Sequence, residues 1–250
     1  MRVVFLGTAG YHPNKKRQTA CVMLPELGIV FDAGTGFFRV REHLKTEKLY
    51  VFLSHYHWDH VIGLTFLIDV AYQKDLKQLS LYGKPPIGAL NQLFSNPFFP
   101  LPLEKHSFES HLHEWSPQHP SWRVGKTLVE ARLFPHHSGG SLGFRLTHKG
   151  KTVVYLTDTS ITADAASFIE GADLFICECN FPNEMKELAI KTTHSYPRLV
   201  AKVAQEAQVK HLVLYHVAPL LKRPSVLKRQ AQRIFDGEIT LAKDEMELTV

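Results

Sequence analysis

The sequence predicts an α/β chain with two β-sheets between helical layers, a four-layer αββα sandwich. Short apolar runs rich in Val, Leu, Ile and Phe recur along the chain and are separated by Gly and Pro, which is typical of strands. Segments with apolar residues at helical spacing alternate with these runs. A first half of strands and helices is followed by a similar second half, which favours two sheets with helices packed outside them.

The first half contains four expected strands and two expected helices. Each expected strand is a short apolar run that ends at Gly, Pro or a polar cluster; these runs are residues 3–6, 19–24, 29–31 and 49–53. The last run is apolar throughout, as in a strand buried on both faces. Helices are expected up to about residue 44 and over about 59–71, where apolar positions recur three and four apart.

The second half repeats this organisation. Strands are expected at residues 127–134, 141–147, 152–156, 174–177 and 211–215, and helices at 183–189, 197–207 and 225–235. Residues 96–120 are rich in Pro, Phe and His, so we expect an irregular segment there, with at most one strand near 108–113. We interpret residues 93–120 as a candidate lid. No internal repeat or low-complexity linker interrupts the chain, which favours one domain over residues 1–250.

The composition is that of a globular chain. The 250 residues are 44% hydrophobic and 21% charged, which excludes wholesale disorder. No apolar run approaches the roughly 18–20 residues of a membrane-spanning helix, so we expect no membrane partner. The net charge of +5 fits an acidic substrate but is weak on its own. Three cysteines are too few for a disulfide framework, and the first residues read as a strand, so we expect a cytoplasmic protein.

The strongest chemical signal is the cluster of His55, His57, Asp59 and His60 directly after the apolar run that ends at residue 53. Side chains alternate in an extended chain, so His55 and His57 point the same way. Asp59 and His60 enter an expected helix and point to a neighbouring position. The cluster therefore predicts two ligand pairs, enough to begin two adjacent metal sites. A polar surface loop is the alternative, but His-x-His-x-Asp-His is a specific pattern.

Three further candidate ligands follow later strands. They are His137, Asp158 and His216, each just past an apolar run. A single His after a strand is more often a solvent-facing residue. Because loops at strand ends gather over one edge of a sheet, three such residues together with the first cluster favour a metal site.

With these motifs the sequence resembles the metallo-β-lactamase-fold hydrolases, in the branch that contains ribonuclease Z and related phosphodiesterases. The resemblance runs over nearly the whole chain in the order of the family. It rests on Phe-Leu-Gly-Thr at 5–8, Phe-Asp-Ala-Gly-Thr-Gly at 31–36, the cluster at 55–60, His137 with Gly-Phe-Arg at 143–145, Leu-Thr-Asp-Thr at 156–159 and Leu-Tyr-His at 214–216.

The resemblance implies a dinuclear metal centre. It implies one ion held by His55, His57 and His137, and a second held by Asp59, His60 and His216. Asp158 would bridge the two ions together with a water or hydroxide. Imidazoles and carboxylates without a thiolate suit Zn²⁺, which we expect, and also Mn²⁺ or Fe²⁺.

Three positions refine this assignment. The family's third ligand stands six residues before the Gly of a Gly-aromatic pair, which selects His137 over its neighbour His136. Asp158 stands where many true β-lactamases have Cys, which argues against lactam hydrolysis. Asp32 resembles the aspartate that supports the ligand loop of the family without binding metal; a turn Asp before Gly is the alternative.

The resemblance also implies a proton donor. Glu178 and the His194-Ser195 pair resemble a glutamate and a His-Ser pair of the phosphodiesterase branch, where the histidine donates a proton to the leaving group and the glutamate orients it. A carboxylate partner keeps an imidazole charged near neutral pH. The alternative is that His194 is only a polar residue at the start of a helix. Cys177 and Cys179 face the same way in a strand, and we expect them to pack as small apolar residues.

We therefore expect a dinuclear metal-dependent hydrolase that acts on a small or cyclic phosphodiester, with a bridging hydroxide as nucleophile and Asp59, Glu178 and His194 in catalytic roles. Ribonuclease Z has a long arm that grips transfer RNA between the third-motif His and the bridging Asp. Only 21 positions (158 − 137) separate His137 from Asp158, and one hairpin fills them, so nucleic acid is not the favoured partner. A nuclease on RNA or single-stranded DNA, an ester, thioester or lactone hydrolase, and a non-catalytic metal-binding protein are the alternatives. A homodimer is left open.

Overall fold

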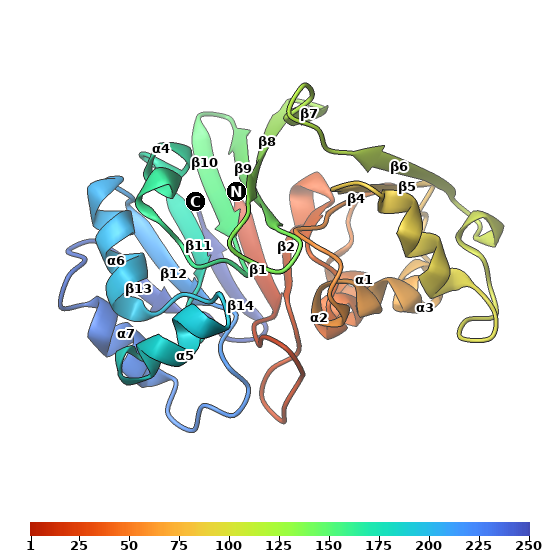
Figure 1. The fold of residues 1–250 in the computed structure, drawn as a ribbon. Coiled ribbons are helices and arrows are strands. Elements are labelled where there is room, and N and C mark those ends of the chain that lie inside the picture. Colours follow the sequence, from red (N-terminus) through yellow and green to blue (C-terminus); the bar gives the residue numbers. More distant parts are fainter. The chain divides into compact units, whose positions relative to one another are not determined.

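The computed structural model covers residues 1–250 and divides into two compact units (Figure 1). Unit 1 consists of residues 1–118 and 243–249, and unit 2 of residues 119–242 with residue 250. No helix is both long enough and apolar enough to span a bilayer. One domain over residues 1–250 stays a prediction.

Unit 1 contains a seven-stranded mixed sheet in the order β14-β1-β2-β3-β4-β5-β6. Its strands are β1 (Arg2–Gly7), β2 (Cys21–Leu24), β3 (Ile29–Phe31), β4 (Lys48–Phe52), β5 (Gln78–Gly83), β6 (Glu109–Glu114) and β14 (Met246–Thr249). The strands from β14 to β3 pair antiparallel, and those from β3 to β6 pair parallel. The carboxyl ends of β3, β4 and β5 therefore meet at one edge, where the loop with the first His cluster begins.

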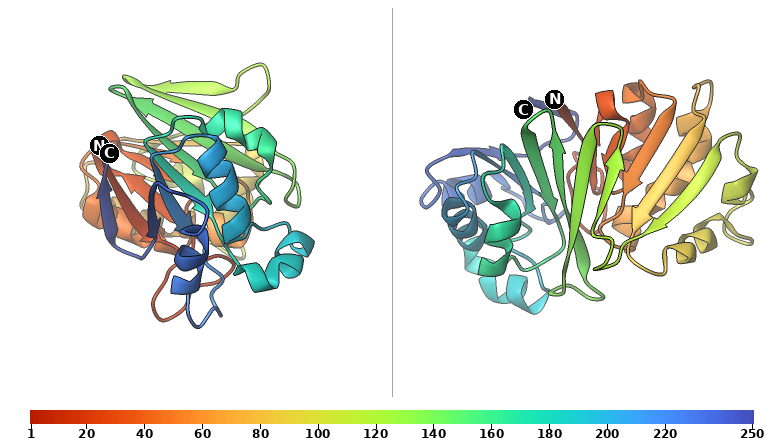
Figure 2. Two further views of the ribbon diagram at one scale, coloured as in Figure 1. Left: turned by 90° about the vertical axis from the view of Figure 1, so that its left-hand side faces the viewer. Right: turned by 90° about the horizontal axis from the view of Figure 1, so that it is seen from above.

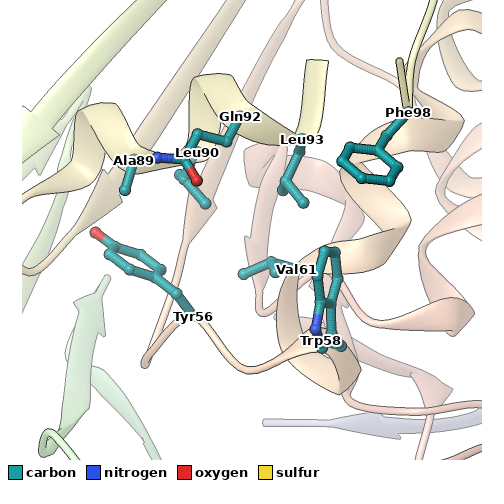
Figure 3. Close-up of a pocket in the computed structure, with 8 residues that line it drawn as sticks. All are labelled: Tyr56, Trp58, Val61, Ala89, Leu90, Gln92, Leu93 and Phe98. Atoms are coloured by element: carbon teal, nitrogen blue, oxygen red, sulfur yellow. The ribbon is translucent and has the colours of Figure 1, made fainter. Parts of the chain in front are cut away.

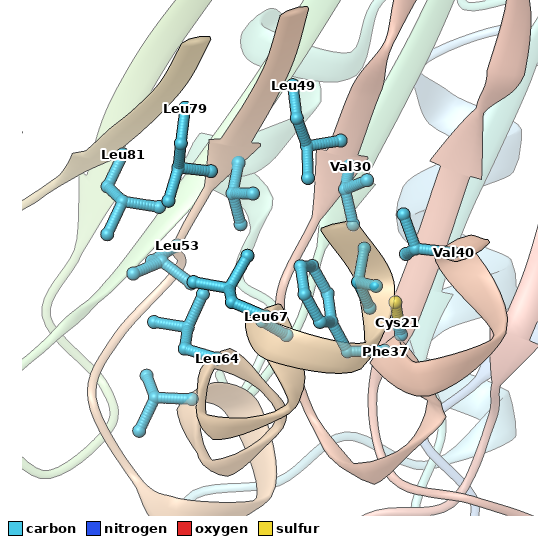
Figure 4. Packing of buried hydrophobic residues seen from close by; sticks show 14 of the residues in the cluster. Cys21, Val30, Phe37, Val40, Leu49, Leu53, Leu64, Leu67, Leu79 and Leu81 are labelled. Atoms are coloured by element: carbon cyan, nitrogen blue, oxygen red, sulfur yellow. The ribbon is translucent and has the colours of Figure 1, made fainter. Parts of the chain in front are cut away.

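One face of this sheet is covered by short helices, namely α1 (Val40–His43), α2 (Trp58–Val61), α3 (Leu67–Ala71) and 3₁₀ segments at Thr35–Arg39, Ile62–Phe66 and Ile87–Phe94. Figure 4 shows how Phe37 and Val40 pack with Leu64 and Leu67 against strand residues such as Val30. All five side chains are fully buried. This apolar layer fixes α2, which carries Asp59 and His60, on the sheet.

Unit 2 contains a second seven-stranded sheet in the order β13-β12-β11-β10-β9-β8-β7. Its strands are β7 (Ser121–Val124), β8 (Thr127–Phe134), β9 (Ser141–His148), β10 (Lys151–Leu156), β11 (Leu174–Glu178), β12 (His211–Tyr215) and β13 (Glu238–Leu241). The strands β10 to β13 are parallel. The helices α4 (Ala166–Ile169), α6 (Pro197–Glu206) and α7 (Ser225–Ala231) pack through their apolar sides on one face of this sheet, and α5 (Lys186–Lys191) precedes α6 (Figure 2).

One expectation about local structure needs correction, and two strands were missed. The expected continuous helix over 59–71 is broken into α2, a 3₁₀ segment and α3, because Val61 leaves the helical region with a φ of −130° and Gly63 packs directly on the loop after β3. The strands β5 and β7 were not expected, since their polar residues interrupt the apolar pattern. In the candidate lid, the one strand expected near 108–113 is present as β6. That residues 93–120 act as a lid stays a prediction.

The close contact at Gly63 gives a stability prediction. A Cβ at this position would lie 2.1 Å from the carbonyl oxygen of Gly34 and 2.5 Å from Cβ of Phe37. We expect Gly63→Ala to lower the free energy of unfolding by about 1–3 kcal/mol, measured by urea denaturation, because packed neighbours must shift. Gly88→Ala is the matched control: nothing lies within 4 Å of its added Cβ, so we expect a change within about 0.5 kcal/mol. Equal losses in the two variants would contradict this explanation.

Candidate metal centre

The first set of candidate donors lies in unit 1, in the loop between β4 and α2. The chain stays extended to His57, whose φ of −66° and ψ of 152° precede the first turn of α2. The imidazole ring of His55 lies 4.5 Å from that of His57 and 4.2 Å from that of His60, measured between ring centroids. The histidines of the predicted cluster therefore converge within one short loop.

Asp32 fixes this loop from the neighbouring strand. It follows β3, which pairs in parallel with β4, and its φ of 56° is one that Asp tolerates better than most residues. Its fully buried carboxylate accepts hydrogen bonds of 2.8 Å from both the amide and the hydroxyl of Ser54. It also lies 2.8 Å from Nδ1 of His60. The supporting position expected for Asp32 agrees with this geometry.

These contacts assign the tautomers of two imidazoles. A carboxylate only accepts, so His60 donates its Nδ1–H to Asp32. Ser54 gives its single hydroxyl hydrogen to Asp32 and therefore accepts from Nδ1–H of His55, at 3.0 Å. In both rings Nε2 then carries the lone pair, which is the form in which a histidine binds a metal ion.

Asp59 directs a carboxylate at one of these nitrogens. Its Oδ2 lies 3.3 Å from Nε2 of His60 and accepts a hydrogen bond of 2.7 Å from the amide of Tyr11. A lone pair that faces a carboxylate oxygen is repelled unless a proton or a cation lies between them. A divalent ion serves both ligands at once, so the donor chemistry of this loop fits a metal.

The second set of candidate donors lies in unit 2, where Asp158 follows β10 and His216 follows β12. Because β10, β11 and β12 are parallel neighbours, their carboxyl ends share one sheet edge. Oδ2 of Asp158 lies 3.1 Å from Nε2 of His216, and one donor atom each from Asp158, His194 and His216 lie within 4.8 Å of one another. Both strand-end residues are buried and have positive φ, 46° and 51°. They lie where the strand-end pattern predicts.

His137 follows β8 in the same unit and has its own orienting partner. Its Nδ1 lies 3.0 Å from Oγ1 of Thr193, and that hydroxyl gives its hydrogen to the carbonyl oxygen of Thr192, at 2.7 Å. His137 must therefore donate Nδ1–H to Thr193, which again leaves Nε2 with the lone pair. This contact favours His137 over the exposed His136 as the donor.

Glu178, at the end of β11, holds His194. The carboxylate is fully buried; it accepts a hydrogen bond of 2.6 Å from the amide of Thr159, and its two oxygens lie 3.1 and 3.3 Å from Nδ1 of His194. The mostly buried imidazole also lies 3.8 Å from Oδ1 of Asp158. Glu178 therefore orients His194 so that Nε2 is left for chemistry outside the pair.

Sequence reasoning missed two residues that orient these donors, Ser54 and Thr193. Each is a hydroxyl residue directly before a histidine of the candidate centre, which is the only local signal of its role. Cys177 and Cys179 are buried and free, and burial raises the pKa of both thiols well above the usual value. They pack as small apolar residues, as the sequence predicts.

The comparisons with known proteins identify the family. A family model described as Beta-lactamase superfamily domain matches residues 28–217. The chain therefore belongs to the beta-lactamase superfamily, and it is a metal-dependent hydrolase of that superfamily. The predicted fold class, the metallo-β-lactamase fold, and the expectation of divalent metal ions as cofactors are confirmed at this level.

Curated relatives and solved structures agree with this family. The Ribonuclease Z of Haloferax volcanii is 28% identical over 301 residues, covering 100% of this chain and 95% of the relative. The Ribonuclease Z of Prochlorococcus marinus (strain MIT 9313) is 29% identical over 313 residues, covering 100% and 98%. The alignments are longer than the 250 residues of this chain, so both relatives carry residues that it lacks.

Two solved structures share the fold over their whole length. The metallo-beta-lactamase fold protein YhfI from Bacillus subtilis has a TM-score of 0.82 at 22% identity, covering 99% of this chain and 98% of that one. The short form of human tRNase Z (ELAC1) has a TM-score of 0.79 at 24% identity, covering 100% and 99%.

The position of Asp32 gives a prediction about metal affinity. Asp32→Asn keeps the shape of the side chain but cannot accept hydrogen bonds at both of its ends, so His60 and Ser54 lose their fixed orientation. We expect the affinity for Zn²⁺ to fall about 10- to 100-fold with an unchanged far-ultraviolet circular dichroism spectrum, measured by competition with a chromophoric chelator. Asp75→Asn, at a mostly exposed carboxylate beside Lys77, is the control. An unchanged affinity in Asp32→Asn would show that the carboxylate does not orient the donors.

Proposed function

We propose that this chain hydrolyses a small phosphodiester, such as a cyclic nucleotide or another cyclic phosphate, with two divalent ions, Zn²⁺ by default, held by the seven ligands that the family resemblance implies. The donors of unit 1 are His55, His57, Asp59 and His60, and those of unit 2 are His137, Asp158 and His216. The reaction adds water to phosphorus and breaks one P–O ester bond, which gives a phosphomonoester and a free hydroxyl group; in a cyclic substrate both are on the same molecule.

One observation carries the metal-binding part of this proposal. His55, His60 and His137 each have Nδ1 engaged by an oxygen of the chain, at 3.0, 2.8 and 3.0 Å. Hydroxyls and a carboxylate that fix three imidazoles in the same tautomer are what a metal-binding histidine requires.

The roles of the chain's own residues follow from chemistry. Two bound divalent ions supply charge neutralisation at the phosphoryl oxygens and a nucleophile at neutral pH. His194 is the group that protonates the departing oxygen, because an alkoxide leaving group needs a positioned acid. Glu178 accepts from Nδ1 of His194 and thereby stabilises its protonated form.

A nuclease is the second candidate, because the curated relatives carry the name Ribonuclease Z. Against it, the segment from His137 to Asp158 consists of one hairpin, β9 and β10, and has no counterpart of the arm expected in ribonuclease Z. A nucleic acid substrate also predicts binding that falls steeply with salt. The short segment favours a small substrate, and the salt dependence of binding is the measurement that separates the two candidates.

The first test is hydrolysis of bis(p-nitrophenyl) phosphate by the zinc- or manganese-loaded protein. We expect turnover, and we expect Asp59→Asn to lower kcat at least about 100-fold, because a metal ligand is lost. Asp75→Asn is the control and should keep the wild-type rate. If the metal-loaded wild type is inert toward this diester, the proposal fails, and carboxylic esters or a non-catalytic role become the better explanations.

The role of His194 predicts a dependence on the leaving group. We expect His194→Gln to lower kcat about 10²- to 10⁴-fold for a 2′,3′-cyclic nucleotide, whose leaving group is an alkoxide. For bis(p-nitrophenyl) phosphate the loss should be under about tenfold, since p-nitrophenolate is stable without protonation. Glu178→Gln should give the same pattern with smaller losses. Equal losses for both substrates would remove the proton donor from the mechanism.

A further inference from the structure

An apolar pocket lies in unit 1 beside the donor loop, and the proposed reaction leaves it unused. Its volume is about 330 Å³, within the range of small-molecule sites. Figure 3 shows its lining, which comes from the donor loop and α2 on one side and from residues 89–98 on the other: Tyr56, Trp58, Val61, Ala89, Leu90, Gln92, Leu93 and Phe98.

The lining combines a buried base with an exposed aromatic rim. Val61 and Leu90 are each 2% exposed, whereas Trp58 is 67% exposed and Phe98 is 87% exposed. Exposed apolar side chains that group around a hollow are a feature of ligand-binding grooves. The pocket is therefore a slot, and the rings of Trp58 and Phe98 at its rim are available to a ligand.

The chemistry of the lining excludes a charged occupant. None of the eight lining residues carries a formal charge, so an anionic phosphate has no partner inside the pocket. The side-chain amide of Gln92 offers both a donor and an acceptor, which suits the polar edge of a flat heterocycle. The hydroxyl of Tyr56 already donates to the carbonyl oxygen of Lys84.

The pocket shares the donor loop with the candidate metal ligands of unit 1, because Tyr56 and Trp58 line it. Trp58 stands between His57 and Asp59 in the sequence, and consecutive Cα atoms are only about 3.8 Å apart. Two lining residues are thus direct chain neighbours of candidate metal donors, which makes the pocket the one to consider for a substituent of a substrate whose phosphate is held at those donors.

We infer that this pocket binds an aromatic ring, of the nucleobase kind, that the phosphodiester substrate carries on its phosphate. The inference rests on the proposed function and names the substrate class for it: a diester of a nucleoside rather than of a simple sugar or alkyl alcohol. Stacking on the indole and phenyl rings supplies affinity without requiring one particular base.

The kinetic test compares two diesters with the same leaving group, the p-nitrophenyl ester of thymidine 5′-phosphate and methyl p-nitrophenyl phosphate, on the metal-loaded protein. We expect Trp58→Ala and Phe98→Ala to raise KM for the thymidine ester about tenfold, with kcat within about threefold, and to leave KM for the methyl ester within twofold. Trp58→Phe should restore most of the affinity. Tyr72→Ala, at an exposed aromatic residue outside the pocket, is the control.

An equilibrium measurement separates failure of the pocket from failure of the reaction. By titration calorimetry of the metal-loaded protein, thymidine 5′-monophosphate should bind about tenfold more tightly than 2-deoxyribose 5-phosphate, and Phe98→Ala should abolish this preference. Suppose that neither ester is hydrolysed, but thymidine 5′-monophosphate binds more tightly than 2-deoxyribose 5-phosphate and Phe98→Ala removes the difference. The pocket then binds the ring, and the proposed reaction is wrong.

Two outcomes overturn the inference. In the first, both esters are hydrolysed with KM values that Phe98→Ala and Trp58→Ala leave unchanged, so the reaction stands and the pocket does not bind the ring. In the second, the two monophosphates bind equally and Phe98→Ala instead converts a dimer to a monomer in sedimentation, so a second copy of the chain is the occupant.

Discussion

The buried carboxylate of Asp32 is the constraint on which the donor loop of unit 1 depends. A carboxylate removed from water costs several kcal/mol unless hydrogen bonds replace its hydration. Here the amide and hydroxyl of Ser54 and the ring of His60 replace it, all at 2.8 Å. An arrangement of the loop without these hydrogen bonds would leave the buried carboxylate without partners. The carboxylate of Asp32 therefore restrains the conformation of the loop. The backbone adds to this restraint, since the amide of Ala33 donates to the carbonyl oxygen of His60 at 2.7 Å.

In unit 2 a buried carboxylate also holds an imidazole, but the proposed role of that imidazole is different. Glu178 is also fully buried, and the amide of Thr159 and the ring of His194 satisfy it. In both pairs the carboxylate holds the imidazole through Nδ1, but the Nε2 atoms of His60 and His194 have different surroundings. Nε2 of His60 faces the carboxylate of Asp59, and the two form a candidate cation site. His194 lies among Asp158 and His216 with Phe181 near its ring, and it serves as the proton donor in the proposed reaction.

The sequence predicts those parts of the centre that are local in the chain. Four donors fall within six residues at 55–60, and Asp158 and His216 are visible because an apolar strand precedes each. What cannot be predicted are contacts between distant segments. Thr193 orients His137 from 56 positions away, and neither residue implies the other. The fold follows the same division: strands with continuous apolar runs were predicted, whereas β5 was not, because its buried Ser80 breaks the pattern.

In the donor loop, side chains alternate along an extended chain, and this alternation separates the candidate metal donors from the residues that line the pocket. Alternate side chains point to opposite sides, so His55 and His57 face one way and Tyr56 the other. The donors occupy the fixed positions of the His-x-His-x-Asp-His motif, while Tyr56 and Trp58 fill its two variable positions and line the pocket. The proposed metal binding constrains only the first group. Under the proposed function the variable positions are therefore free to differ with the substrate, because a change there leaves the proposed metal ligands in place.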